Sequence, residues 1–184
     1  MRDSPGCCLW SSNCYAATPP SSGSPASLLR VYFAYQNQSG WAYDPLSRAY
    51  LRYVDTSEYD QAGILHPDTD RLTGRQLHVE NLIVLYARHD VVSPTNLDIH
   101  LGQGKTGPAV LFRNGLMFKI KWSTMPQEQN GGQVRPIRFL ENDGTPAALA
   151  PGHTWVIVVT PDSKLELTSP GQWLLNFVQP PGAK

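Results

Sequence analysis

The stretch LDIHLGQGKTGPAVLFRNGLMFKIKW, residues 97–122, decides the fold class of this chain. Two runs rich in apolar residues, 109–113 and 116–122, meet at the tripeptide Arg-Asn-Gly. Asn-Gly between such runs is the strongest short-range signal of a β-hairpin, because a type I′ turn requires positive φ at both central residues. The stretch therefore predicts two antiparallel strands joined by a tight turn.

The rest of the chain repeats this pattern of short apolar runs separated by turn residues. Its 16 prolines fall between the runs, which are filled by Trp, Tyr and β-branched residues as is typical of strands. The near-continuous run Leu82–Ala87 predicts a strand buried on both faces. We predict no long helix, and therefore an all-β fold, an antiparallel sandwich or partly open barrel. Further strands are predicted at 28–33, 49–54, 97–101, 135–140 and 154–160, with either a strand or a short docking helix at 171–178.

At 184 residues the chain suits one domain of ordinary size. Residues 1–26 are polar, rich in Ser and Pro, and end in TPPSSGSPA. This composition predicts a disordered tail or linker remnant, followed by a single β-rich domain over residues 27–184. The three cysteines, Cys7, Cys8 and Cys14, all lie in the predicted tail, where they could pair, bind a metal ion or stay free.

Composition excludes several classes of partner. Fifteen basic residues balance fifteen acidic ones, and no basic cluster stands out, so we predict no nucleic-acid partner and no polybasic membrane contact. No run approaches the roughly 20 apolar residues of a transmembrane helix. The first residues show no apolar core of a signal peptide.

Two short motifs resemble ligand-binding motifs, but in each of them a turn is the favoured interpretation. GQGKTG at 102–107 resembles a phosphate-binding loop, but Ile99 stands where that loop needs its first glycine and a strand follows in place of a helix. A glycine turn is the favoured interpretation, with an anion pocket at Lys105 as the weaker one. His66, Asp68 and Asp70 could bind a divalent cation, but a plain surface turn, which Pro67 and Thr69 suit, is favoured.

No catalytic set emerges from the spacing of nucleophiles and bases. A Gly-x-Ser-x-Gly elbow is absent, and the histidines are scattered along the chain. If a residue transfers protons, His89 beside Asp90 is the first candidate. We therefore predict no catalytic residue, no metal site and no cofactor, and leave an enzymatic role open.

Six residues are the candidates for ligand binding: Trp41, Tyr43, Arg52, His89, Lys105 and Arg138. Aromatic side chains such as Trp41 and Tyr43 belong in the core, or line a groove for a sugar or peptide if they stand at an exposed turn. Arg52 and Arg138 lie inside predicted strands next to aromatic residues, where they could snorkel or pair with Asp44 or Asp143.

Four stretches together resemble one known family. They are YDPLSRAYLRYVD at 43–55, DRLTGRQLHVENLIVLY at 70–86, LGQGKTGPAVLFRNG at 101–115 with Trp122 after it, and PIRFLENDGTPAALAPGHTWVIVVTP at 136–161. In this order and spacing they resemble the C-terminal domain of the YerB-like family of bacterial proteins, over roughly residues 30–161. Members of that family have no established function and look like lipid-anchored, two-domain envelope proteins. The resemblance implies an envelope location and a further domain ahead of this one. It also implies a turn at Asp70 with Thr73 and Gly74, in which Asp70 caps the following backbone.

The leading hypothesis is a non-enzymatic binding module that recognises a protein or a cell-wall polymer through an edge strand or a groove. The alternative is half of a two-domain enzyme, whose cleft needs an N-terminal domain. A third is a structural remnant with no role of its own. The ligand and the oligomeric state do not follow from the sequence.

Overall fold

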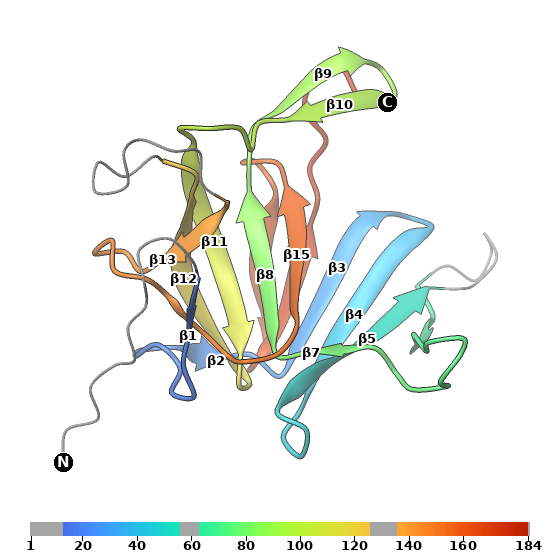
Figure 1. Ribbon diagram of the computed structural model, residues 1–184. Coiled ribbons are helices and arrows are strands. Elements are labelled where there is room, and N and C mark those ends of the chain that lie inside the picture. The colour runs from blue at the N-terminus through green and yellow to red at the C-terminus, as the bar shows by residue number, and fades with distance from the viewer. Residues whose placement is uncertain (1–12, 56–62, 126–135, 184) are drawn as a thin grey trace.

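Two β-sheets packed face to face form this protein (Figure 1). The computed structural model describes residues 13–55, 63–125 and 136–183. Within these ranges the chain forms strands and no helix, so the predicted all-β class is confirmed as an open sandwich. No helix in the described part of the chain is long and apolar enough to cross a membrane.

The first sheet has six strands and is built around the predicted hairpin. Its order is β13-β12-β11-β8-β15, and β2 also pairs with β12. Asn114 and Gly115 have φ of 53° and 71°, so the positive φ values expected at the hairpin turn are confirmed. The strands are β2 (Ser24–Pro25), β8 (Asn81–Tyr86), β11 (Thr106–Arg113), β12 (Leu116–Ser123), β13 (Arg138–Leu140) and β15 (Thr154–Val159).

The second sheet has seven strands and mixes antiparallel with parallel pairing. Its order is β16-β17-β3-β4-β5-β6, with β7 paired to β5. The C-terminal run is strand β17, which lies parallel to β3, and of the two predicted alternatives the strand is therefore the one found. The strands are β3 (Leu28–Ala34), β4 (Asn37–Asp44), β5 (Ala49–Asp55), β6 (Leu65–Pro67), β7 (His78–Val79), β16 (Lys164–Ser169) and β17 (Gln172–Asn176).

Two short pairs complete the fold. Strand β9 (His89–Ser93) pairs with β10 (Asn96–Ile99) in a hairpin that projects beyond the sheets at the top of Figure 1. Strand β1 (Cys14–Tyr15) lies parallel to β14 (Ala148–Leu149). The predicted strand at 135–140 is found at 138–140, and Arg135 lies outside the described residues.

Both faces of the six-stranded sheet are buried. Leu82, Val84 and Phe112 belong to the core between the two sheets. Ile83, Leu85 and their neighbours belong to a second core on the opposite face, which the segment leading to β14 covers. The alternation of side chains along a strand therefore buries every residue of Leu82–Leu85, as the continuous apolar run predicted.

The described part of residues 1–26 packs against the sheets. Ala26 is fully buried, β2 pairs with β12, and Cys14 is disulfide-bonded. Cys7 and Cys8 lie outside the described residues. The predicted tail thus carries backbone pairs from residue 14 onward, whereas the boundary at residue 27 stays a prediction.

Candidate functional site

Strand β15 ends the six-stranded sheet and has a free edge. It pairs with β8 alone, in parallel, over six consecutive residues from Thr154 to Val159. The carbonyls of His153 and Val159 accept hydrogen bonds from the β8 side. Because backbone groups alternate along a strand, those of Thr154, Val156 and Val158 point away from β8. In the described part of the chain, no other strand takes them up.

The other edge strands of the two sheets carry features that discourage pairing. β13 and β6 are each three residues long, and β6 ends at Pro67. β16 carries Lys164 and Glu166, and its register is irregular between Leu167 and Ser169. Short length, proline, charge and bulges are the usual ways in which proteins block a sheet edge. The sequence of β15, TWVIVV, has none of them.

A pocket of about 280 Å³ opens beside this edge, between β15 and strands β4 and β5. Trp155 on β15 is 38% exposed, and its ring centroid lies 5.3 Å from that of the buried Trp41 on β4. The guanidinium of Arg52, on β5, lies 4.7 Å from the Trp155 centroid and 5.7 Å from the Trp41 centroid. The amide side chains of Asn37 and Gln38 add polar groups to the wall.

The Arg52 guanidinium is held in place by contacts on several sides. It forms an ion pair with Asp68, and the two indole rings provide cation–π contacts. Its Nε and the Nε1 of Trp41 are buried and have no hydrogen-bond partner in the described ranges. The pocket therefore combines the surface of two indole rings with a guanidinium group, an arrangement that suits a flat or apolar side chain.

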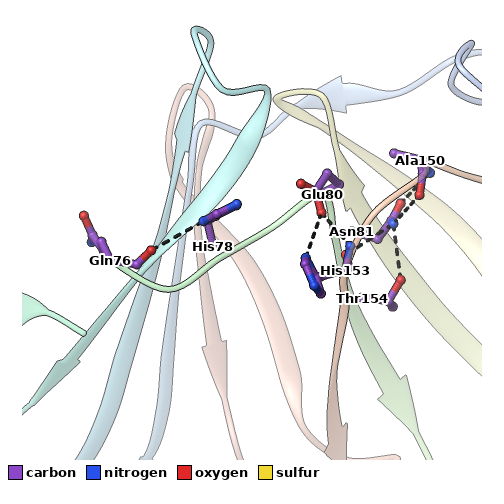
Figure 2. Close-up of polar contacts among 7 residues, drawn as sticks. All are labelled: Gln76, His78, Glu80, Asn81, Ala150, His153 and Thr154. Atoms are coloured by element: carbon purple, nitrogen blue, oxygen red, sulfur yellow. Dashed lines mark hydrogen bonds and ion pairs between the residues drawn. The ribbon is translucent and has the colours of Figure 1, made fainter. Parts of the chain in front are cut away.

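The base of β15 is fixed by a buried asparagine (Figure 2). Asn81 Nδ2 donates to the Ala150 carbonyl at 2.9 Å and to Thr154 Oγ1 at 3.2 Å, and its Oδ1 accepts from the Ala150 N–H at 2.7 Å. The carboxylate of Glu80 accepts the N–H of His153 at 2.6 Å. These bonds hold the entry to β15 rigidly, which favours a preformed edge.

Of the six binding candidates, the structure brings Trp41 and Arg52 together at this pocket. Tyr43 packs against Tyr50, with ring centroids 5.4 Å apart, and lies over Gly115 of the hairpin. The other three candidates lie on other elements. His89 is in β9 with its Nδ1 2.9 Å from the Ala87 carbonyl, Lys105 is in the turn before β11, and the buried Arg138 in β13 donates to the Met125 carbonyl.

The two arginine pairings expected from the sequence are wrong. Asp44 accepts from the Leu46 N–H and from Ser47, because it caps the turn between β4 and β5. Asp143 similarly accepts from Thr145. Arg52 pairs instead with Asp68, a residue that the sequence assigned to a turn.

The glycine motif at 102–107 forms a turn, whereas in the second motif His66 belongs to strand β6 and the turn follows Asp70. The N–H of Lys105 donates to Thr124 Oγ1 and that of Gly104 to the Thr124 carbonyl, so these donors are used within the protein. Asp70 caps the N–H groups of Leu72 and Thr73, as predicted. Within the described ranges no group of three His, Cys, Asp or Glu side chains is placed to hold a metal ion.

Asp90 follows His89 in the sequence, but its carboxylate contacts Arg88 and His100. Its carboxylate accepts from Arg88 Nε and contacts His100 Nε2, each at 2.7 Å. Chiefly because of the hydrogen bond from Arg88, the pKa of Asp90 lies below its ordinary value. No hydrogen bond joins His89 to Asp90 among the described contacts.

Sequence reasoning missed Trp155 and Asn81 as site residues. The run at 154–159 indicated a strand, but the position of this strand at a sheet edge, which gives Trp155 its role, depends on the pairing of β15 with β8. Asn81 gave no signal of its role, since its partners Ala150 and Thr154 lie some 70 positions later, with sequence separations of 69 and 73.

By its fold the protein is an all-β open sandwich, and among the described strands the edge of β15 carries no blocking feature. The family model described as "Protein of unknown function (DUF3048) C-terminal domain" matches residues 29–156, more than half of the 184-residue chain. The chain therefore belongs to this family.

A relative with a curated name is YerB of Bacillus subtilis. "Putative lipoprotein YerB" of strain 168 is 28% identical over 131 residues, which are 71% of this chain and 33% of the relative. The crystal structure of the YerB protein from Bacillus subtilis superposes with a TM-score of 0.55 at 23% identity, over 77% of this chain and 42% of that one. The chain thus spans about a third of the curated relative's length, and the structural likeness supports the fold.

Proposed function

We propose that this domain is a non-enzymatic recognition module, which binds an extended polypeptide by adding it as a strand to the free edge of β15. The observation that carries this proposal is the combination of six regularly paired residues, no blocking feature and outward backbone groups without a strand partner among the described residues. Strand addition uses such an edge, because backbone hydrogen bonds supply affinity and pockets for alternate side chains supply specificity.

The pocket beside β15 would supply the specificity. Trp155 lies on the face of β15 that carries Ile157 and Val159 toward the core between the sheets. Alternate side chains of an added strand would point to this same face and reach the pocket. A flat or apolar side chain fits best there, since the rings of Trp41 and Trp155 line the pocket.

The test is a selection of random dodecapeptides on the full chain, followed by binding measurements with two variants. Val156→Pro removes an outward N–H without touching the bonds to β8, and proline is tolerated at edges where its nitrogen faces solvent. We expect enriched peptides to lose at least about tenfold in affinity for Val156→Pro, because each loses a backbone hydrogen bond and meets the ring.

The matched control is Val156→Thr, which keeps the N–H and should bind within about twofold of the native chain. Amide NMR spectra establish that each variant is folded. Should Val156→Pro unfold, Val156→Lys places a charge at the same edge and should weaken binding similarly. Peptides that bind Val156→Pro or Val156→Lys as well as the native chain, peptides that shift amides away from β15, or a selection that enriches nothing would contradict the proposal.

We propose an envelope location for the same module, and the support is the printed name of the relative, a lipoprotein-type name. Fractionation of the source cells with an antibody to the domain tests it, and a signal confined to the cytosol would contradict it. The alternative of a half-enzyme stays a prediction. It requires turnover by the longer protein that a substitution in this domain abolishes.

A further inference from the structure

A second and larger hollow lies between the sheets, away from β15. Its volume is about 830 Å³, and residues of β11 and β12 face it from one sheet while Leu165 of β16 and Trp173 of β17 face it from the other. The buried Val110 and Met117 line it, and so does the half-buried Tyr86. We call this hollow the β12–β16 groove.

The groove exists because the two sheets separate from each other along β12. Met117, Lys119 and Lys121 alternate onto the same face of this strand, the face that looks toward the second sheet. Met117 is buried in the core, whereas both lysines are exposed. Core residues would be apolar at these positions, so the lysines mark where the second sheet no longer covers the first.

The opposite wall continues the apolar surface outward. Leu165 pairs with Leu175 in register, and Leu167 pairs with Trp173, which puts all four side chains on the inner face of the second sheet. Leu167 is 57% exposed even though it shares this face. An apolar wall therefore reaches from the core to the mouth of the groove.

The mouth carries positive charge without a counter-ion. Among the described residues no carboxylate lies within ion-pair distance of Lys119 or Lys121, and Lys121 Nζ donates only to the Asn142 carbonyl, at 3.2 Å. Burial raises the pKa of the Tyr86 phenol, which therefore stays protonated and able to donate. The groove thus joins an apolar channel to a cationic rim.

We propose that the β12–β16 groove binds a lipid: a single acyl chain lies in the apolar channel, and its anionic head group meets Lys119 and Lys121. Charge complementarity at the rim requires an anion. An aliphatic chain fits better than a polypeptide, because β11 and β17 are each paired on both sides and β12 pairs on its outer side with β2 and β13 over five of its eight residues. The edge strand β16 carries Lys164, Glu166 and an irregular register, which discourage strand addition. The volume lies within the range of about 300–1,000 Å³ that is usual for small-molecule sites.

The test titrates the full chain with dodecanoate, below its micellar concentration, by calorimetry and amide NMR. Dodecyltrimethylammonium, which has the same chain and the opposite charge, is the paired probe. We expect dodecanoate to bind one per chain and at least about tenfold more tightly than the cation, with shifts at Val110, Met117 and Trp173.

Charge reversal at the rim separates this site from general detergent binding. Lys119→Glu changes an exposed side chain and should leave the fold intact, while abolishing the preference for the anionic probe, because one glutamate and one lysine then share the rim. Lys164→Glu is the matched control, because Lys164 is exposed on β16 and does not line the groove, and it should leave both affinities within about twofold.

Several results would overturn the proposal. They are equal affinity for the two probes, an unchanged preference in Lys119→Glu, shifts confined to β15, or no binding of dodecanoate. Binding of an acidic peptide such as hexaglutamate at the same rim, with dodecanoate excluded, would assign the groove to a protein partner and also overturn it.

Discussion

Arg113 shows how a single buried side chain can tie remote segments of this chain together. The residue is 1% exposed. Its guanidinium donates to the carbonyls of Ala148, Ala16 and Ala17 at 2.6–2.8 Å. No carboxylate among the described residues pairs with it, so carbonyl dipoles alone stabilise the charge. Burial correspondingly lowers the pKa of Arg113.

Replacement of Arg113 by Met should therefore destabilise the fold. Three carbonyls lose their donor, and we expect the free energy of unfolding to fall by about 2–4 kcal/mol. Urea unfolding followed by tryptophan fluorescence measures it. The exposed Arg75→Met serves as control and should change stability by less than about 0.5 kcal/mol. A loss of similar size in both variants would show that the three bonds contribute nothing specific.

A second prediction at the scale of single residues concerns Gly107. A Cβ at this position would lie 2.6 Å from Trp122 Nε1 and 2.9 Å from the Tyr86 carbonyl, which are hydrogen-bonded to each other. Gly107→Ala should cost about 1–3 kcal/mol of stability, as overpacking does. In Gly102→Ala the new methyl meets nothing within 4 Å, so thermal unfolding of this control should match the native chain. Equal melting of both variants would refute the expected clash.

The sequence could not have revealed these two residue-scale roles. GQGKTG identifies a glycine turn, but the need for Gly107 arises from an indole that the next strand brings alongside it. Asp70 differs, because its partners Leu72 and Thr73 are two and three positions away. Local partners of this kind are predictable from the sequence, whereas partners supplied by tertiary packing are not.

At the scale of elements, three turns depend on an aspartate that accepts hydrogen bonds. Asp44, Asp70 and Asp143 each bond to residues two or three positions later. These bonds hold the pKa of all three carboxyls below the ordinary value, chiefly through Ser47, Thr73 and Thr145 respectively. The ionised form is thus favoured in the folded protein.

Acid should weaken these turns in a definite direction. A carboxyl whose pKa is lowered by folding contributes its full stabilisation above its ordinary pKa, near about 4, and loses it as the pH falls through the lowered value. We therefore expect the melting temperature to fall between about pH 4 and pH 2. Asp70→Asn keeps an acceptor that does not titrate, so its melting temperature should fall less over this range. An equal fall in both proteins would contradict the contribution of Asp70.

Strand positions followed from the sequence better than strand partners. The hairpin β11–β12 was predicted because its turn and both strands are contiguous. The parallel pairing of β15 with β8, and of β17 with β3, joins residues that are far apart in the chain. Apolar patterning indicates that a strand is buried, but does not say which neighbour buries it. The edge of β15 is free because β15 pairs with β8 alone, and the structure was needed to show this.

Over the whole molecule, several residues between 13 and 26 take part in the packing. The hydroxyl of Tyr50 donates to the Ala26 carbonyl at 2.7 Å, β2 pairs with Leu116 and Met117, and two of the Arg113 acceptors precede residue 18. Serine and proline content predicts a disordered tail or linker remnant over residues 1–26, and this assignment stays a prediction. Composition does not register backbone pairs to distant strands such as those of β2.

Removal of residues 1–26 tests that assignment. The remaining chain loses the buried Ala26, the β2 pairs and two bonds to Arg113, so we expect its unfolding free energy to fall by about 3 kcal/mol or more. Urea unfolding of the full chain and of residues 27–184, side by side, gives the difference. Equal stability would instead support the domain boundary predicted at residue 27.

The parallel pair of β3 and β17 has a mechanical consequence. Leu28 lies opposite Gln172 and Tyr32 opposite Asn176, so the start of β3 and the end of β17 sit at opposite ends of one ladder. A pull applied at these two points loads all the hydrogen bonds of the ladder at once, in shear, and none can open alone. A domain tethered at both ends would therefore resist tension, and rupture would wait for the whole ladder to slip.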